Sequence, residues 1–276
     1  MKIAIIVDSS SGIKDMSHYK DLYLVPLMIT KEDGTQIEDD ESFSNEEFYK
    51  LNKEQVLKTS QSIPETMLNK WDELLKDYDK VICLLISKGL SGQYNTFKMF
   101  SNEEEYKNKV FVVDTNGVSI LIKRQVKYIY KLMDHKKSIE EIINSIENIS
   151  SNLLGYIIPK NLSQLVRGGR ISKAAAGLAR ILRITPILKY DGTIDKEGKT
   201  RTFKKAVSNA LDLIKKNNQN NLELDIACSK SDEETINLVK KVVEEKGFKV
   251  GIWENIPNVV TCHTGEETFA FIPNLY

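Results

Sequence analysis

The sequence predicts an α/β protein of two domains, and three observations lead to this prediction. The chain has 276 residues, close to the length at which a single hydrophobic core stops growing and chains divide into domains. Its first half alternates short apolar runs with helical patterns, which is typical of a parallel sheet covered by helices on both faces. Its second half has strand patterns with fewer helices between them, which indicates an α+β domain with a mixed or antiparallel sheet. The predicted domains are residues 1–152 and 153–276.

In the first half, four apolar runs predict buried strands, and amphipathic stretches predict five helices. The predicted strands are residues 3–7, 22–29, 81–86 and 110–113. The predicted helices are residues 46–51, 66–76, 94–106, 118–133 and 139–149. A serine followed by a glutamate three residues later has the spacing of a capping box. This spacing occurs at Ser44 and Glu47, at Ser62 and Glu65, and at Ser138 and Glu141.

In the second half, six segments have the pattern of strands. They are residues 153–158, 186–190, 223–228, 249–253, 258–262 and 269–272. The dipeptide Asp191-Gly192 fits a hairpin turn after the second of them. Ser172 is placed to cap a helix in which Lys173, Arg180 and Arg183 share one face, opposite an apolar face. That basic face is equally consistent with a solvated surface and with a surface that docks a partner.

Composition limits the classes of function and location. The formal net charge is zero, so the molecule as a whole does not have the positive charge that attracts nucleic acids, and we expect no nucleic-acid partner. Residues 160–205 are nevertheless basic, with twelve lysines or arginines against three acids. The three cysteines have no metal-ligand spacing, and the apolar run near the N-terminus is too short for a signal peptide. We therefore expect reduced thiols and a cytoplasmic protein.

Hydroxyl-bearing segments follow three predicted strands of the first half, and one more precedes the helix predicted at residues 66–76. They are residues 8–12 (Asp-Ser-Ser-Ser-Gly), 59–62 (Thr-Ser-Gln-Ser), 87–92 (Ser-Lys-Gly-Leu-Ser-Gly) and 114–115 (Asp-Thr). Ligands of an open parallel sheet bind beyond the carboxyl ends of its strands. Hydroxyls and backbone N–H groups at helix starts suit a carboxylate or a phosphate. Each loop alone fits an ordinary turn, but together they predict an anion site at this edge.

Several short motifs, in order along the chain, resemble the DegV family of fatty-acid-binding proteins. They are Thr-Ser-Gln at 59–61, Leu-Ser-Gly at 90–92, Val-Val-Asp-Thr and Gly-Val-Ser within 112–119, Arg-Gly-Gly-Arg-Ile-Ser at 167–172 and His-Thr-Gly at 263–265. The end of the first strand, Ile-Val-Asp-Ser-Ser-Ser at 6–11, is similar to that family as well. No single motif is specific, but the ordered set covers essentially the whole chain.

The resemblance implies a two-domain fold with a long-chain fatty acid buried between the domains and no other cofactor. It implies that the carboxylate is bound by Thr59, Ser91 and His263, with Ser60, Gly92 and Thr264 beside them and Arg167 in the same network. It further implies that the protein is a carrier, which presents the acid to a fatty acid kinase for phospholipid synthesis. Any contact with the membrane surface is expected to be transient. Residues expected to dock the kinase are Arg170, Lys173 and Arg201.

The sequence departs from the family pattern in two places. Ser62-Ile63-Pro64 stands where the family has Pro-Ser-Pro, and Glu266-Glu267 follows the His-Thr-Gly motif in place of Pro-Gly. Acidic side chains beside a carboxylate site raise the free-energy cost of binding an anion unless they point to solvent. The position of these two glutamates is therefore a test of the carboxylate site.

Two other classes of function stay open on the residues alone. A hydrolase would use Ser91 and His263 with an acid such as Asp8 or Asp114, although the chain does not have the G-x-S-x-G pattern around Ser91. A phosphotransferase would use the Gly-Gly-Arg turn and the hydroxyl loops for phosphate, although no Walker A motif is present. The lipid carrier is the function that we expect.

Overall fold

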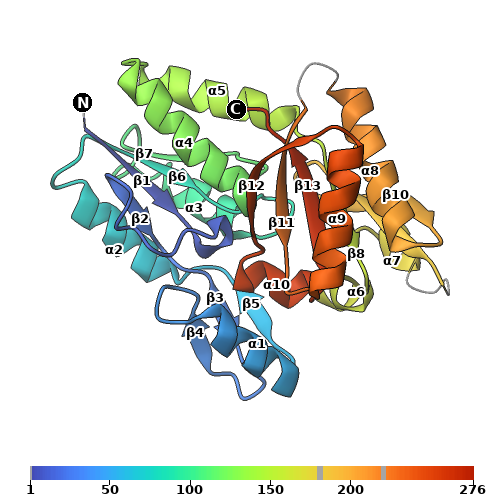
Figure 1. Ribbon diagram of the computed structural model, residues 1–276. Helices are drawn as coiled ribbons and strands as arrows, with labels where there is room; N and C mark the ends of the chain where they lie inside the picture. The colour runs from blue at the N-terminus through green and yellow to red at the C-terminus, as the bar shows by residue number, and fades with distance from the viewer. Residues whose placement is uncertain (1, 179–182, 219–221) are drawn as a thin grey trace. The chain divides into compact units, whose positions relative to one another are not determined.

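A computed structural model describes residues 2–178, 183–218 and 222–276 of the chain (Figure 1). The chain divides into two compact units. The first unit comprises Met1–Ser151 together with Pro257–Cys262, and the second comprises Asn152–Ile256 together with His263–Tyr276. None of the helices among the described residues is long and apolar enough to cross a membrane.

The first unit contains the predicted parallel sheet. Its four strands lie in the order β2-β1-β6-β7, and every neighbouring pair is parallel. The bounds are β1 Ile3–Val7, β2 Leu22–Leu24, β6 Lys80–Leu84 and β7 Val110–Val113. Because the strands are parallel, the loops that follow β1, β6 and β7 leave the sheet at one edge. This sheet confirms the predicted class of the first half.

Helices cover both faces of this sheet (Figure 1). On one face, α2 (Pro64–Leu74) and α3 (Gln93–Phe100) pack against alternate strand residues. At their contact, Trp71 lies 6.0 Å from Phe97 between ring centroids, and its side chain is fully buried. On the other face lie α4 (Ile120–Asp134) and α5 (Ile139–Ser151). The predicted capping boxes at Ser44 and at Ser138 are present.

A small antiparallel sheet completes the first unit and was not predicted. It consists of β3 (Met28–Thr30), β4 (Gln36–Glu38) and β5 (Lys58–Ser60), in the order β4-β3-β5, with α1 (Asn45–Glu54) following β4. The prediction of one strand over residues 22–29 is wrong, since β2 and β3 belong to different sheets. Pro26 lies between them, and proline cannot donate a hydrogen bond to a central strand.

The second unit contains a six-stranded sheet in the order β10-β9-β8-β13-β11-β12. Only β11 and β12 pair in parallel, so the sheet is mixed, as predicted. Helices α8 (Phe203–Asn217) and α9 (Glu233–Glu245) pack their apolar residues on one face of it. The bounds of the strands are β8 Gly155–Pro159, β9 Thr185–Tyr190, β10 Ile194–Thr200, β11 Glu223–Cys228, β12 Lys249–Asn255 and β13 Thr268–Pro273.

Among the described residues, the remaining α-helices are short: α6 (Ser163–Gly168), α7 (Lys173–Gly177) and α10 (Asn258–Thr264). The prediction of a strand at residues 258–262 is therefore wrong. The buried carboxylate of Asp39 accepts hydrogen bonds from Asn258 Nδ2 at 3.1 Å and from the Val259 backbone N–H at 3.2 Å. An acid at the start of a helix satisfies N–H groups that have no partner within the helix. This contact crosses most of the sequence, so local pattern could not reveal it.

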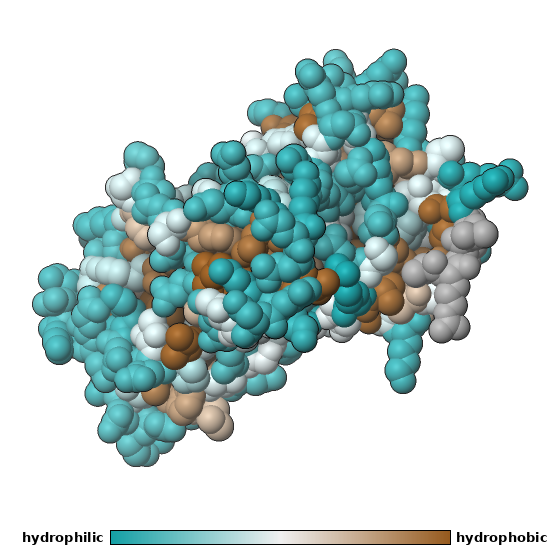
Figure 2. All heavy atoms as spheres, turned by 90° about the horizontal axis from the view of Figure 1, so that it is seen from below, coloured by the Kyte–Doolittle hydropathy of each residue, from teal (hydrophilic) through white to brown (hydrophobic). Residues whose placement is uncertain are grey.

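One face of the molecule is largely hydrophilic (Figure 2), and the three thiols are buried. On the face shown in Figure 2, hydrophilic side chains predominate and apolar atoms appear in small patches. Cys83, Cys228 and Cys262 are all buried and free, as expected from the sequence. Burial raises the pKa of the Cys83 thiol to about 12, so this thiol is unreactive near neutral pH.

Candidate functional site

In the first unit, the loops that follow β1, β6 and β7 are bonded to one another. After β1 the chain forms a short 3-10 helix, η1 (Ser9–Ser11). The Ser119 N–H donates to the carbonyl of Ser10 at 2.6 Å, and the Ser87 N–H donates to the carbonyl of Gly117 at 2.8 Å. The structure therefore brings the hydroxyl-rich loops together at one edge of the sheet, as the sequence predicted.

Thr59 and Ser60 lie in β5, on opposite sides of the strand. Thr59 pairs with Ile29 of β3, and Ser60 pairs with Met28. Successive side chains of a strand point to opposite faces. The hydroxyl of Ser60 accepts a hydrogen bond from Gln36 Nε2 at 3.1 Å. Ser60 therefore bonds within the small sheet. Thr59 points to the opposite face of β5, where its hydroxyl suits a ligand.

Ser91 lies just before α3, and Gly92 is the exposed N-cap residue of that helix. The Ser91 Oγ accepts a hydrogen bond from the Gln93 backbone N–H at 3.2 Å. Because the oxygen accepts this bond, the O–H of Ser91 is oriented to donate elsewhere. A donor of this kind suits a carboxylate. The partner of Ser91, Gln93, was missed by the sequence reasoning, since no local pattern distinguishes a buried glutamine from an exposed one.

In the second unit, His263 lies against the basic turn at residues 167–170. A Cβ placed on Gly168 would come within 2.6 Å of His263 Nδ1, so only glycine leaves room for the imidazole there. Burial and the nearby Arg170 guanidinium lower the pKa of His263 to about 4. The imidazole is therefore neutral near pH 7, with one nitrogen that donates a hydrogen bond and one that accepts. Thr264 is buried beside it at the end of α10.

Lys160 neutralises one of the two glutamates in the turn after His263. Lys160 Nζ lies 2.6 Å from Glu267 Oε1, and the Lys160 backbone N–H donates to the Glu267 carbonyl at 3.0 Å. Gly265 has a φ of +78°, and a Cβ there would come within 2.1 Å of Gln164 Oε1. The departure at Glu267 is thus compensated within the second unit, because its negative charge has a cation beside it. Glu266 is partly buried.

The predicted docking residues are exposed. Arg170 Nη1 donates to the carbonyl of Gly168 at 2.6 Å and closes the turn. Ser172 caps α7 as predicted, since its Oγ accepts the Ala175 N–H at 3.0 Å. Arg167, Lys173 and Arg201 are exposed. The prediction that Arg183 shares a helix face with Lys173 is wrong, because α7 ends at Gly177 and Arg183 lies exposed in a turn with a φ of +55°. Arg180 lies outside the described residues.

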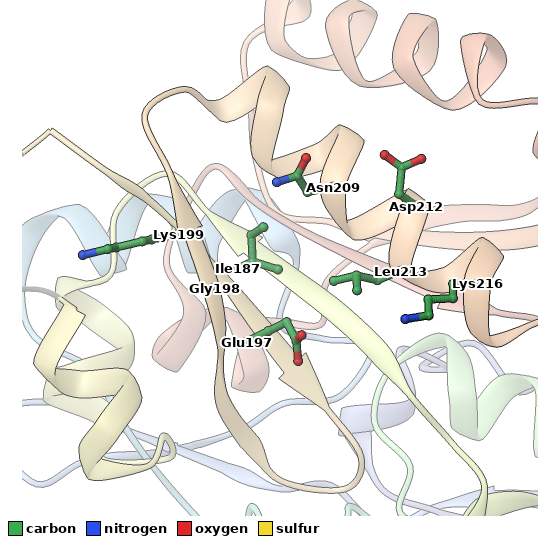
Figure 3. A pocket seen from close by; sticks show the side chains of 8 residues that line it. All are labelled: Ile187, Glu197, Gly198, Lys199, Asn209, Asp212, Leu213 and Lys216. Carbon is green, nitrogen blue, oxygen red and sulfur yellow. The ribbon is translucent and has the colours of Figure 1, made fainter.

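A separate surface pocket of about 360 Å³ lies in the second unit between β10 and α8 (Figure 3). It is lined by both acids and lysines, among them Glu197, Lys199 and Lys216, above the apolar side chains of Ile187 and Leu213. None of the predicted ligand residues lines it. Because charges of both signs are spread around its rim, the pocket has no set of groups that converge on one charged ligand.

The hydrolase alternative needs an acid that can orient a histidine, and Asp8 does not fit that role. Asp8 is fully buried. Its Oδ1 accepts hydrogen bonds from the backbone N–H and the hydroxyl of Ser10, and its Oδ2 accepts from the Ile86 N–H and from Gln93 Nε2. Four donors saturate a carboxylate. Asp114 forms an ion pair with Lys88 at 2.5 Å.

Among the described residues, no cluster suits a metal ion.

Comparison with known proteins identifies the class. The fold of the chain matches the crystal structure of a fatty acid binding DegV family protein from Streptococcus agalactiae with a TM-score of 0.87, 24% identity and 99% coverage of each chain. The chain also matches a fatty-acid-binding DegV family protein from Thermus thermophilus, with a TM-score of 0.86, 26% identity and 99% coverage of each chain.

The sequence comparisons lead to the same family. A DegV domain-containing protein from Mycoplasmopsis pulmonis is 29% identical over 272 residues, which is 96% of this chain and 92% of that protein. The model of the family described as "Uncharacterised protein, DegV family" matches residues 2–273. The chain belongs to the DegV family.

Proposed function

We propose that the protein binds a long-chain fatty acid and carries it. The observation that supports this most is the match over the whole chain to the fatty-acid-binding DegV protein of Thermus thermophilus. The physics of the ligand agrees with a carrier. Burial of each CH₂ contributes at most about 0.8 kcal/mol before the cost of association, so the acyl chain supplies affinity without any reactive group.

The carboxylate, in this proposal, accepts hydrogen bonds from Thr59, Ser91 and His263. The Ser91 hydroxyl is oriented as a donor by the Gln93 N–H, and the lowered pKa of His263 keeps its imidazole neutral. Ser60, Gly92 and Thr264 flank these donors, and Arg167 supplies a positive charge to the same network. No cofactor takes part.

We propose further that the bound acid is presented to a fatty acid kinase, which forms the acyl phosphate. Arg170, Lys173 and Arg201 are exposed, as residues that dock a partner must be. The net excess of positive charge in residues 160–205 suits a partner that carries a nucleotide. The protein itself supplies binding and orientation, and the chemistry belongs to the kinase.

The carboxylate site is tested by single substitutions and titration with a labelled long-chain acid. Thr59→Val, Ser91→Ala and His263→Gln should each weaken binding to delipidated protein by about 1–2 kcal/mol, the scale of one hydrogen bond to a charged group. Ser42→Ala, on an exposed turn far from these residues in sequence, is the control and should bind as the wild type does. Wild-type affinity in all three variants would refute the assigned carboxylate site.

A further inference from the structure

Gln93 is a buried polar residue that contacts both hydroxyl-bearing segments of the first unit. Its side chain is fully buried. Its Oε1 accepts a hydrogen bond from the Ser62 backbone N–H at 2.7 Å, just after the Thr-Ser-Gln motif. Its own backbone N–H donates to Ser91 Oγ at 3.2 Å. One residue therefore fixes the loop next to Thr59 and orients the hydroxyl of Ser91.

The orientation of the Gln93 amide is fixed by Asp8. Gln93 Nε2 donates to Asp8 Oδ2 at 2.8 Å, and the same oxygen accepts the Ile86 N–H at 2.8 Å. A carboxylate accepts hydrogen bonds and a backbone N–H donates them. The amide therefore has its nitrogen toward Asp8 and its oxygen toward Ser62, and the reverse orientation would lose both bonds.

Two further bonds attach the same loop. Thr96 follows Gln93 by three residues, which places both on one face of α3. The Thr96 hydroxyl donates to Gln61 Oε1 at 3.0 Å. The Ser62 hydroxyl donates to the carbonyl of Val25 at 3.2 Å, which explains why the capping box predicted for Ser62 and Glu65 is wrong. The N-cap position of α2 is taken by Ile63, and Ser62 serves as an anchor.

These bonds connect two sheets, each of which contributes one of the hydroxyls proposed to bind the carboxylate. Thr59 lies in the three-stranded sheet, whereas Ser91 follows the four-stranded sheet. Backbone hydrogen bonds within either sheet therefore do not fix the distance between the Thr59 and Ser91 hydroxyls. A donor pair binds one carboxylate well only if its spacing is fixed in advance.

We propose that Gln93, held by Asp8, is the positioning residue that fixes Thr59 and Ser91 relative to each other for recognition of a carboxylate. This inference rests on the proposed function. It predicts that Gln93 acts on the ligand's head group through the two hydroxyls and has no effect of its own on burial of the acyl chain.

The test compares palmitic acid with the alcohol of the same chain length, for the wild type and for Gln93→Met. Methionine keeps the length of the side chain and removes both hydrogen bonds of the side-chain amide, to Ser62 and to Asp8. We expect affinity for the acid to fall about tenfold, a loss on the scale of one hydrogen bond to a charged group, while affinity for the alcohol stays within about twofold. A purely structural role would weaken both ligands equally.

Gln125→Met is the matched control. Gln125 is also a fully buried glutamine of the first unit, and its Nε2 donates to the Thr115 carbonyl at 2.9 Å. Gln125→Met should lower the melting temperature as much as Gln93→Met does and leave the ratio of acid affinity to alcohol affinity unchanged. Thr96→Val, an isosteric change at a partly buried site, keeps the test available if Gln93→Met does not fold. It should reduce acid affinity alone, by about threefold.

Two results would overturn the inference while leaving the proposed function intact. One is an unchanged ratio of acid to alcohol affinity in both Gln93→Met and Thr96→Val. The other is the same change of ratio in Gln125→Met. A wild type that takes up neither ligand would instead refute the proposed function, and the inference with it.

Discussion

At the scale of single residues, two adjacent glycines have different physical roles in the turn at residues 167–170. Gly168 has no room for a side chain, because a Cβ would come within 2.6 Å of His263 Nδ1. Gly169 has open space around it but a φ of +67°, in the left-handed region. The first glycine therefore positions His263, and the second only lets the helix α6 end.

Gly168→Ala should displace the His263 imidazole and weaken binding of a long-chain acid about tenfold, the scale of one lost hydrogen bond to a carboxylate. Gly169→Ala should cost about 1 kcal/mol of stability and leave acid binding near that of the wild type. The two variants are compared by acid titration and thermal unfolding. Equal acid affinities in the two variants would contradict the assigned role of Gly168.

His263 also predicts a dependence of stability on pH. Its pKa is lowered to about 4 in the folded protein, against about 6.5 in an unfolded chain. Between these values the unfolded chain binds more protons, so stability rises with pH in this window. The contribution is fully present above about pH 6.5 and is lost as the pH falls toward 4.

Urea unfolding at a series of pH values measures this effect. His263→Gln should flatten the slope of the unfolding free energy between pH 4 and pH 6.5 by up to about 1.4 kcal/mol per pH unit. His18→Gln, at an exposed histidine, is the control for the loss of an imidazole. Identical slopes for the wild type and His263→Gln would show that burial does not shift this pKa.

The sequence predicts the hydroxyls of the proposed site but not the residue that orients them. Thr59 and Ser91 belong to short motifs; Ser91 follows a predicted strand and Thr59 precedes a predicted helix, so the type and the place of both residues could be predicted. Gln93 has neither signal, because its function depends on contacts with Asp8 and Ser62, which are 85 and 31 positions away. Such contacts exist only after the loops have folded, and no local pattern encodes them.

At the scale of elements, strands buried on both faces were the easiest to predict. The apolar runs of β1, β6 and β7 are continuous, as expected when helices cover both faces of a parallel sheet. The three-residue strands β4 and β5 are polar or half-exposed, so they carry no such signal. Helix α10 was predicted as a strand because its apolar run is β-branched, and a distant carboxylate decides its conformation.

That distant carboxylate should be essential for α10. Asp39 is fully buried, its Oδ1 lies 2.5 Å from Lys14 Nζ, and its carboxylate accepts hydrogen bonds from Asn258 and Val259. Asp39→Asn leaves Lys14 without its anion and should destabilise the protein by on the order of 3 kcal/mol, as the loss of one partner from a buried pair does. Denaturant unfolding measures this loss.

The neighbouring substitution Glu38→Gln is the control for Asp39→Asn, since Glu38 is exposed at the end of β4. It should change stability by less than about 0.5 kcal/mol. If both substitutions cost the same small amount, the carboxylate does not hold α10 in place.

At the scale of the whole molecule, the proposed carrier has two separable properties, loading and presentation. Arg170 is exposed on the basic turn, and most of the affinity for the acid should come from the acyl chain. Arg170→Ala should therefore load acid nearly as well as the wild type and slow acyl-phosphate formation by a fatty acid kinase. Lys173→Ala should act in the same direction more weakly, and added salt should slow the wild type by screening the encounter.

The comparison for these variants is acid loading against phosphorylation rate for the same protein. Parallel losses in both quantities would assign Arg170 to the carboxylate site. An unchanged phosphorylation rate would remove its role in docking.

Native mass spectrometry of the purified recombinant protein tests most directly whether this chain carries a long-chain fatty acid. We expect a species heavier than the bare chain by the mass of one long-chain acid. On denaturation it should fall to the mass of the chain and release an acid that lipid analysis identifies. Recovery of bare protein that also takes up no labelled long-chain acid after delipidation would show that the protein is not such a carrier.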